Sequence, residues 1–295
     1  MGLYRKGSPM DQRLTYTFLV AIAIEILFPL FLGLWLRRRF RVPWKLFAYG
    51  ALVYVAVQLP RYVGIQVLQS YLRDTLQAGT IYMVAWIAFA ALTAGLFEEG
   101  GRYLGYRFLW GKEEKTWPGA LMYGAGHGGV ESIVLVGLVS IWSLLQFIAL
   151  QQIDMSALSP EELATVEEAI QIFAAVPWWA PLMAALERLL AITIQISLAV
   201  LVLQVFRRGR FYWWWLAVGY HTVVDLLVVL APYLLAQYLP PEATTFPTES
   251  ITLLFALVTE SITLLFALLG IGIILRLRPA PAEPLAASPP AAPPP

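Results

Sequence analysis

Seven long apolar stretches follow one another along the chain, and each can cross a lipid bilayer, which takes about 20 apolar residues. They lie at 14–36, 44–60, 80–109, 117–150, 177–206, 211–238 and 248–275. The third, fourth and fifth exceed one crossing, so we expect them to tilt, kink or protrude. The pattern predicts an all-α bundle of transmembrane helices, in one integral-membrane domain over residues 1–278.

The composition agrees with a membrane protein. The 295 residues are 59% hydrophobic and 13% charged, against about 45–50% and about 25% in a typical soluble domain. The net charge of +1 gives no field that would attract nucleic acid. The chain has no cysteine, which excludes disulfides, thiol catalysis and metal bound by cysteine. We therefore expect the lipid bilayer as a partner, and no nucleic acid.

Basic residues gather between alternate stretches. Fourteen of the 20 Lys and Arg residues lie in 37–45, 102–115, 207–210 and 276–278. Since cytoplasmic loops are enriched in Lys and Arg, this distribution predicts an N-terminus outside and a C-terminus inside. The short loops, and the lack of a eukaryotic targeting signal, fit the plasma membrane of a prokaryote.

Two segments between or after the stretches differ from the rest. Residues 151–176 are acidic, and Ser159-Pro160-Glu161-Glu162 has the order of a helix N-cap, a first-turn proline and a capping-box glutamate. We expect a short helix there, outside the membrane. Residues 279–295 contain eight prolines, which predicts a disordered Pro/Ala-rich tail.

The last stretch contains an exact repeat, with ten residues from Thr248 recurring from Thr259. The period of eleven residues is close to three helical turns, so Glu249 and Glu260 share a face. That face could form a polar stripe beside a cavity. We favour the simpler interpretation, a tandem duplication that lengthened the span.

Some ionisable residues fall inside the predicted spans, where charge is costly, and they are candidate functional residues for that reason. They are Glu25, Glu98, Glu99, Arg102, His127, Glu131, Glu187, Arg188, His221, Asp225 and Glu260. At a helical rise of about 1.5 Å per residue, the pair Glu98 and Glu99 lies roughly 17 Å from the inner surface. His127 and His221, the two histidines of the chain, both lie roughly 15 Å from it. We therefore expect one layer that holds a carboxylate pair and both histidines, near the cytoplasmic side and open toward it.

Local spacings add detail to this layer. Arg102 follows Glu98 by four residues and Glu99 by three, so it can hold either carboxylate and leave the other free. Each histidine has an acid four residues later, Glu131 after His127 and Asp225 after His221, which could fix the imidazole tautomer. Four glycines in 124–129 predict close helix approach or local unwinding. Taken singly, each of these features is also typical of structural packing, and Glu187 with Arg188 is a possible clamp.

Two histidines and a free carboxylate can bind a metal such as zinc, with Glu98, His127 and His221 as candidate ligands, and activate its water. A glutamate can equally act as the general base on a water while the histidines stabilise an oxyanion. Both chemistries predict hydrolysis of a peptide bond within the membrane, in a membrane-protein or lipidated-peptide substrate. A proton-coupled transporter could use the same groups as a relay, and a non-catalytic relative is a third alternative.

Three motifs occur in order along the chain. They are Glu98-Glu99-Gly100-Gly101-Arg102-Tyr103, Gly126-His127-Gly128-Gly129-Val130-Glu131 and His221-Thr222-Val223-Val224-Asp225. In these motifs, residues 10–278 resemble the YhfC-like intramembrane metalloproteases, relatives of the CAAX-prenyl-protease and bacteriocin-processing (CPBP, or Abi) superfamily. The resemblance implies a helical glutamate-dependent peptidase. Glu98 or Glu99 would activate water, His127 would be the second-motif histidine, and His221 with Asp225 would form the third motif.

One position departs from the pattern that the resemblance implies. In that pattern, Glu-Arg of the fifth span is followed about seven residues later by a histidine, whereas here Glu187-Arg188 is followed by Gln195. Gln195 lies roughly 17 Å from the inner surface, in the layer of the site. An amide is a poor metal ligand, which favours a metal-free mechanism, or a changed or lost activity, over a three-histidine metal site.

Overall fold

The computed structural model describes residues 12–240 and 247–280, and this part of the chain is helical, without strands. The helices are α1 (Gln12–Phe40), α2 (Lys45–Gln77), α3 (Thr80–Leu104), η1 (Gly105–Leu109), α4 (Trp117–Glu131), η2 (Ser132–Gly137), α5 (Leu138–Leu150), η3 (Met155–Ala157), α6 (Pro160–Ala174), α7 (Ala180–Arg208), α8 (Tyr212–Tyr238) and α9 (Thr248–Arg276). Seven helical segments are long and apolar enough to cross a membrane. The prediction of an all-α bundle with seven spans is confirmed. Most of the predicted disordered tail lies outside the described residues.

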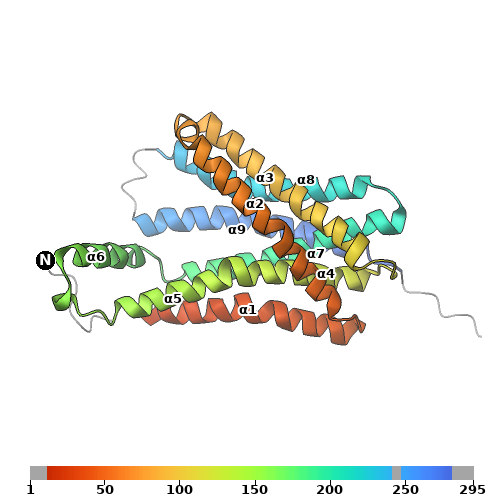
Figure 1. The fold of residues 1–295 in the computed structure, drawn as a ribbon, viewed down its shortest axis with the longest axis horizontal. Helices are drawn as coiled ribbons and strands as arrows, with labels where there is room; N and C mark the ends of the chain where they lie inside the picture. The colour runs from red at the N-terminus through yellow and green to blue at the C-terminus, as the bar shows by residue number, and fades with distance from the viewer. Residues whose placement is uncertain (1–11, 241–246, 281–295) are drawn as a thin grey trace, which may run out of the picture.

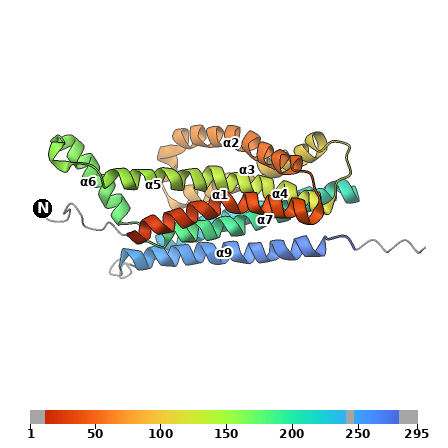
Figure 2. The same cartoon turned by 90° about the horizontal axis from the view of Figure 1, so that it is seen from below.

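Helix α7 occupies the middle of the bundle, where it packs against α1, α4, α8 and α9 (Figures 1 and 2). Nearly all of its stretch from Ser197 to Gln204 is buried. Helices α2 and α3 form a pair that leans across the bundle, with α2 on α4 and α3 on α8 (Figure 1). The three motifs lie on α3, α4 and α8, so this packing brings them together around α7.

Helix α2 is longer than the sequence indicated. Our prediction ended the second span at residue 60, but the helix continues through Pro60 to Gln77. A proline removes one backbone hydrogen bond, and in membranes neighbouring groups commonly compensate for this loss. Apolar side chains of the added turns, such as Tyr62 and Val67, are exposed on the surface, as expected for contact with lipid. Arg61, which directly follows the predicted second span, is consequently part of a helix.

Glycines let α4 approach its neighbours very closely. A Cβ atom on Gly126 would lie 2.0 Å from the carbonyl oxygen of Phe47 in α2, and one on Gly124 would lie 2.6 Å from the Cα of Ile196 in α7. The close approach predicted from the glycine run is thus confirmed. Unwinding of the run is not observed, because α4 stays α-helical to Glu131, and the π-helical segment η2 begins one residue later.

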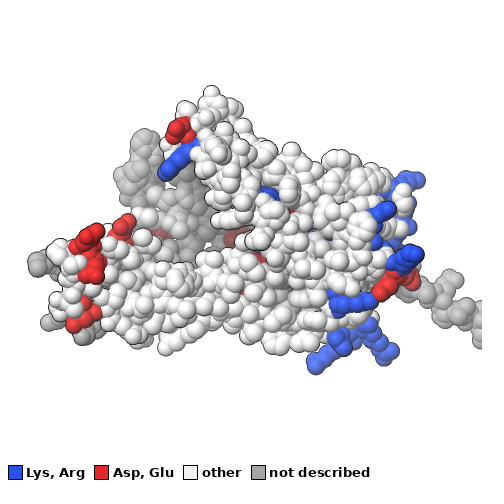
Figure 3. Space-filling view, viewed as in Figure 1, with Lys and Arg blue, Asp and Glu red and all other residues white. Residues whose placement is uncertain are grey.

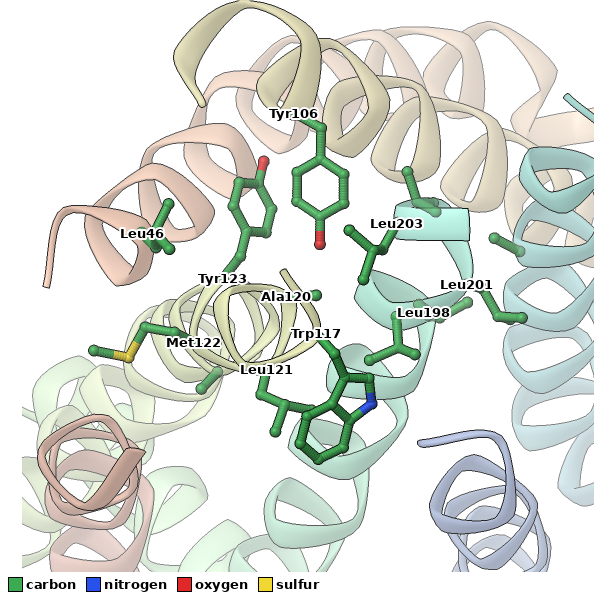
Figure 4. Packing of buried hydrophobic residues seen from close by; sticks show 14 of the residues in the cluster. Leu46, Tyr106, Trp117, Ala120, Leu121, Met122, Tyr123, Leu198, Leu201 and Leu203 are labelled. Carbon is green, nitrogen blue, oxygen red and sulfur yellow. The ribbon is translucent and has the colours of Figure 1, made fainter. Parts of the chain in front are cut away.

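Large side chains fill one end of the bundle. Tyr106, Trp117, Tyr123 and neighbouring leucines of α7 form a continuous buried cluster (Figure 4). The hydroxyl of Tyr106 donates to the carbonyl of Ala199 at 2.9 Å, and the indole N–H of Trp117 donates to that of Ile274 at 3.0 Å. This cluster closes the end at which α1, α7 and α9 finish, which we call the basic end.

Charge is distributed unequally between the two ends of the bundle. Figure 3 shows Lys and Arg gathered at the basic end and acidic side chains at the opposite end, where α6 lies. We call this opposite end the acidic end. Helix α6 begins with the predicted capping box, in which Ser159 and Glu162 each bind the other's backbone N–H. Hydrogen bonds from the hydroxyl and from the backbone N–H of Ser159 hold the pKa of the Glu162 carboxyl below its usual value.

This charge distribution predicts that the basic end faces the cytoplasm. Green fluorescent protein fused after Arg278 is therefore expected to fluoresce, and alkaline phosphatase at that position to be inactive. The same reporters placed in the loop between Leu150 and Pro160 should give the opposite result. Active phosphatase after Arg278 would reverse the orientation.

The glycine contacts predict a strong effect of Gly126→Ala. The added methyl group meets backbone atoms of α2, and overpacking of this kind costs about 1–3 kcal/mol. The thermal unfolding midpoint of purified protein in detergent should therefore fall by several degrees. Gly272→Ala is the matched control, because a Cβ there has no atom within 4 Å and alanine favours the helix. Equal midpoints for the two variants would contradict this interpretation.

Candidate active site

The carboxylate of Glu98 is the centre of a polar cluster inside the bundle. Its Oε2 atom lies 3.0 Å from Nε2 of His127, 3.2 Å from Nε2 of Gln195 and 3.8 Å from Nε2 of His221. Its Oε1 atom accepts a hydrogen bond of 2.7 Å from the amide of Gln58. Side chains from α2, α4, α7 and α8 thus converge on one acid of α3. The predicted layer, with both histidines beside the carboxylate pair, is observed.

Glu99 makes a different set of contacts. Its two oxygens bind Arg102 at 3.1 Å and Nδ1 of His221 at 2.9 Å. Arg102 also donates to Oε1 of Gln195 at 2.5 Å. Glu99 and Arg102 have no exposed surface. Arg102 therefore holds Glu99, and Glu98 is the carboxylate that remains available at the cavity described below.

Glu131 and Arg188 extend the cluster. Glu131 accepts from the amide of Gln195 at 2.8 Å and from Arg188 at 3.2 Å, and Arg188 is also paired with the adjacent Glu187. The expected hydrogen bond between His127 and Glu131 is not observed. The imidazole turns its Nε2 to Glu98 on the neighbouring helix, and its Nδ1 has no partner among the described residues.

The contact expected between His221 and Asp225, four residues apart on α8, is observed only in part. Asp225 lies 3.7 Å from Nε2 of His221, a long contact, whereas the short hydrogen bond of this imidazole goes to Glu99. Glu98 and Glu99 of α3 therefore orient the two histidines. The acids one turn after each histidine on its own helix do not. Which acid contacts each histidine depends on the rotation of each helix about its axis. The spacing of residues along one helix does not predict that rotation.

Several other ionisable residues of the spans lie outside this cluster. Glu25 is buried between α1 and the segment after α4, and neither of its carboxylate oxygens has a partner among the described residues. Glu249, in the first copy of the repeat, accepts a hydrogen bond from the indole of Trp179 at 3.2 Å. Glu260, in the second copy, forms no hydrogen bond or ion pair with the cluster among the described residues, and interacts with Glu187 and Arg188 only at longer range.

A cavity of about 570 Å³ leads to Glu98. Its polar lining consists of Gln58, Arg61, Glu98, Glu131, Glu187, Arg188, Gln195, His221, Asp225, Tyr233 and Thr263, and its apolar lining comes mainly from α3 and α8. On α3 and α7 the lining residues precede the site, and on α8 they follow it. All of them therefore lie between the site and the acidic end, where Figure 3 shows a hollow beside the α2–α3 pair.

The direction of this cavity corrects one expectation. We expected the site to open toward the basic end, which is the nearer surface by residue count. The aromatic and leucine cluster fills that end, and the cavity extends from Glu98 toward the acidic end. Depth along a helix can be counted from residues, but the filling of space between helices depends on side-chain packing.

Sequence analysis also missed a set of polar residues on α2. Tyr54, Gln58 and Arg61 follow one another at spacings of four and three, so they share a helix face. The ring of Tyr54 meets that of His127 edge-on, with centroids 5.2 Å apart, and Gln58 binds Glu98. This spacing was available in the sequence. Tyr54 and Gln58 are neither acids, basic residues nor histidines, and Arg61 follows the predicted end of the second span, so none of the three is a candidate by charge within a span.

Residues 24–240 match the sequence model of the YhfC intramembrane metalloprotease family. The chain belongs to this family. The matched range contains every residue of the Glu98 cluster and of the cavity except Thr263. An uncharacterized membrane protein, YhfC from Bacillus subtilis (strain 168), is 30% identical over 193 residues, which are 64% of this chain and 73% of that protein. No solved structure matches the chain significantly.

The family description implies a metal, and the donor atoms present are compatible with one. Glu98, His127 and Glu131 each offer a ligand atom, and these atoms lie within 4.8 Å of one another. Carboxylate oxygen and imidazole nitrogen suit zinc and other divalent first-row metals. Gln195 directs its NH₂ group at Glu98 and Glu131, because its oxygen accepts from Arg102. That group donates hydrogen bonds and is no metal ligand.

The position of Gln195 predicts that Gln195→His binds zinc at least tenfold more tightly than the wild type, because an imidazole would replace an amide donor beside two acids. Zinc affinity of the purified protein, measured by competition with a coloured chelator, checks this. Gln195→Ala is the control, since it loses the same hydrogen bonds without adding a ligand. Equal affinities for all three proteins would contradict the prediction.

The buried ion pair predicts a large loss of stability for Arg102→Ala. Glu99 would remain buried without its cation, which costs about 3–5 kcal/mol. Arg102→Lys, which keeps the charge, should lose less. Lys45→Ala breaks the exposed pair of Lys45 with Glu113, which solvent screens, and should change stability little. Thermal unfolding in one detergent compares the three, and a similar small loss in all would contradict the structural role of Arg102.

Proposed function

We propose that this protein is a glutamate-dependent intramembrane endopeptidase in which Glu98 activates the water that attacks a peptide bond. The observation that carries the proposal is the position of one carboxylate oxygen, which lies near Nε2 of both histidines at the closed end of a cavity. A carboxylate placed in this way can take a proton from water at the moment that the water attacks. The residues around it offer donors for the negative charge that then develops.

The steps balance within this set of residues. Glu98 removes one proton from a water molecule, and the water oxygen forms a bond to the carbonyl carbon of the substrate. His127, His221 and the NH₂ group of Gln195 surround this position and can stabilise the oxyanion of the tetrahedral intermediate. The C–N bond then breaks, and Glu98 returns its proton to the leaving amine. The products are a new carboxyl group and a new amino group.

Glu99 and Arg102 act as positioning residues in this proposal. The Glu99 carboxylate can only accept from Nδ1 of His221, so Nδ1 carries an N–H, and the donor for an oxyanion is the second N–H, at Nε2, that the doubly protonated ring carries. This leaves Nε2 directed at Glu98 and Asp225. A divalent metal bound by Glu98, His127 and Glu131 would supply Lewis-acid activation of the water and the carbonyl.

The proposal also includes the domain that carries the activity and its place in the membrane. We place the whole activity in one membrane domain over residues 1–278, in the plasma membrane of a prokaryote, with the basic end in the cytoplasm. In that orientation, substrate enters from the outer side, because the cavity opens toward the acidic end. A relationship to the CPBP superfamily is supported by the order of the three motifs.

Glu98→Gln is expected to lower the cleavage rate at least about 100-fold, the range of general-base catalysis. The assay uses full-length protein in lipid nanodiscs and a pool of membrane-protein fragments, with products identified by mass spectrometry. Glu260→Gln is the matched control, because Glu260 is a half-buried glutamate of a span outside the cavity lining. Cleavage by Glu98→Gln at the wild-type rate would refute the proposed role.

The same variants separate the proposal from its main alternative. A proton-coupled carrier would show pH-dependent uptake in proteoliposomes without any cleavage. That result, abolished by Glu98→Gln and retained by Glu260→Gln, would replace a peptidase by a transporter.

A further inference from the structure

Arg61 is the one cation of the cavity lining that forms no close ion pair among the described residues, although Asp225 interacts with it electrostatically at longer range. Its two terminal nitrogens donate to neutral oxygens, the side chain of Gln58 at 3.2 Å and the carbonyl of Ala90 at 2.8 Å. Its Nε atom is buried and has no hydrogen-bond partner. Arg188, the other arginine of the lining, is instead held between Glu131 and Glu187. The charge of Arg61 is therefore uncompensated by any direct contact.

The position of Arg61 makes this unusual. It follows Lys45 by 16 residues on α2, which is roughly 24 Å along the helix from the basic end. A charged side chain at such depth in a bilayer is costly. Charged residues found there commonly serve a binding or transport role. A purely structural arginine at this depth would be expected to pair with an acid, as Arg102 and Arg188 both do.

We propose that Arg61 binds a carboxylate group of the peptide substrate, an inference that rests on the proposed peptidase function. A guanidinium group offers several N–H donors in a plane and is well suited to a carboxylate. Here the guanidinium group has only neutral acceptors, so a bound carboxylate would compensate its charge.

The structure also indicates where this carboxylate stands relative to the bond that is cut. The side-chain amide of Gln58 bridges Glu98 and Arg61. Its nitrogen donates to Glu98, and its oxygen accepts from Arg61. Two hydrogen bonds and one amide group cover about the length of two extended residues, at roughly 3.3–3.6 Å each. The bound carboxylate thus belongs about two residues from the scissile bond.

The other charges of the cavity narrow the class of substrate. The cavity is also lined by the acids Glu131, Glu187 and Asp225. Away from Arg61, these acids would repel a second acidic group on the ligand. The walls from α3 and α8 are largely apolar, with residues such as Ile87 and Val228. The ligand that fits is an apolar peptide with one carboxylate, which belongs either to an acidic side chain or to the peptide's own C-terminus.

A binding measurement tests this site independently of catalysis. The full-length protein carries Glu98→Gln to prevent hydrolysis and is held in nanodiscs of neutral phosphatidylcholine. The probes are three fluorescent apolar hexapeptides with the same core: one with a free C-terminal carboxylate, one with a C-terminal amide, and one with an amide and a single glutamate. Fluorescence anisotropy gives the dissociation constant of each.

We expect at least one of the two carboxylate probes to bind about tenfold or more tightly than the neutral probe, and the stronger of them identifies the source of the carboxylate. Adding Arg61→Gln should abolish this preference, whereas Arg61→Lys should keep part of it. Arg73→Gln, which removes an exposed arginine of the same helix outside the cavity lining, should leave the preference unchanged.

Equal binding of all three probes, or a preference that survives Arg61→Gln, would overturn the inference and leave the peptidase proposal standing. Displacement of the acidic probe by anionic phosphatidylglycerol, dependent on Arg61, would assign the site to a lipid phosphate and also overturn it. A preference that depends on Arg61, in a protein whose wild type cleaves nothing, would uphold the carboxylate site and refute the peptidase.

Discussion

A guanidinium group without exposed surface lies at the centre of this bundle, and its charge must be balanced by groups inside the protein. Arg102 obtains that balance from Glu99 on its own helix and from the amide oxygen of Gln195 on α7. Each contact has a second effect. Glu99 uses its other oxygen to hold His221, and Gln195 is left with its NH₂ group facing Glu98 and Glu131. The need to neutralise one cation thus orients the groups on two other helices that face Glu98.

This network requires helices that lie unusually close together. The glycines of α4 provide the closeness, since Gly124 and Gly126 bring its backbone against α7 and α2. His127 stands on the same stretch of α4, between these two close contacts, and its side chain reaches the Glu98 carboxylate on α3. The polar cluster and the glycine run are therefore two parts of one arrangement, in which small residues allow ionised ones to meet.

Much of the fold and part of the site could be predicted from the sequence. Six of the seven spans end within a few residues of their predicted limits, because bilayer thickness sets the length of an apolar helix. Counting residues from the basic flanks placed Glu98, His127 and His221 at one depth, since the rise of an α-helix is constant. Rotation about the helix axis is not constrained in that way. It decided that His127 contacts Glu98 and not Glu131, and the packing of large side chains around Tyr106 and Trp117 decided which end of the cavity is closed.

The described lining of the cavity lies on the acidic side of Glu98, and for the proposed peptidase this has a kinetic consequence. A substrate and both fragments made from it would occupy the same space between the site and the acidic end. The fragment that keeps its contacts with the cavity walls would then compete with the next substrate molecule. Turnover in such a protein would be governed by fragment release into the lipid or the outer solution, and inhibition by product would be a built-in property of its shape.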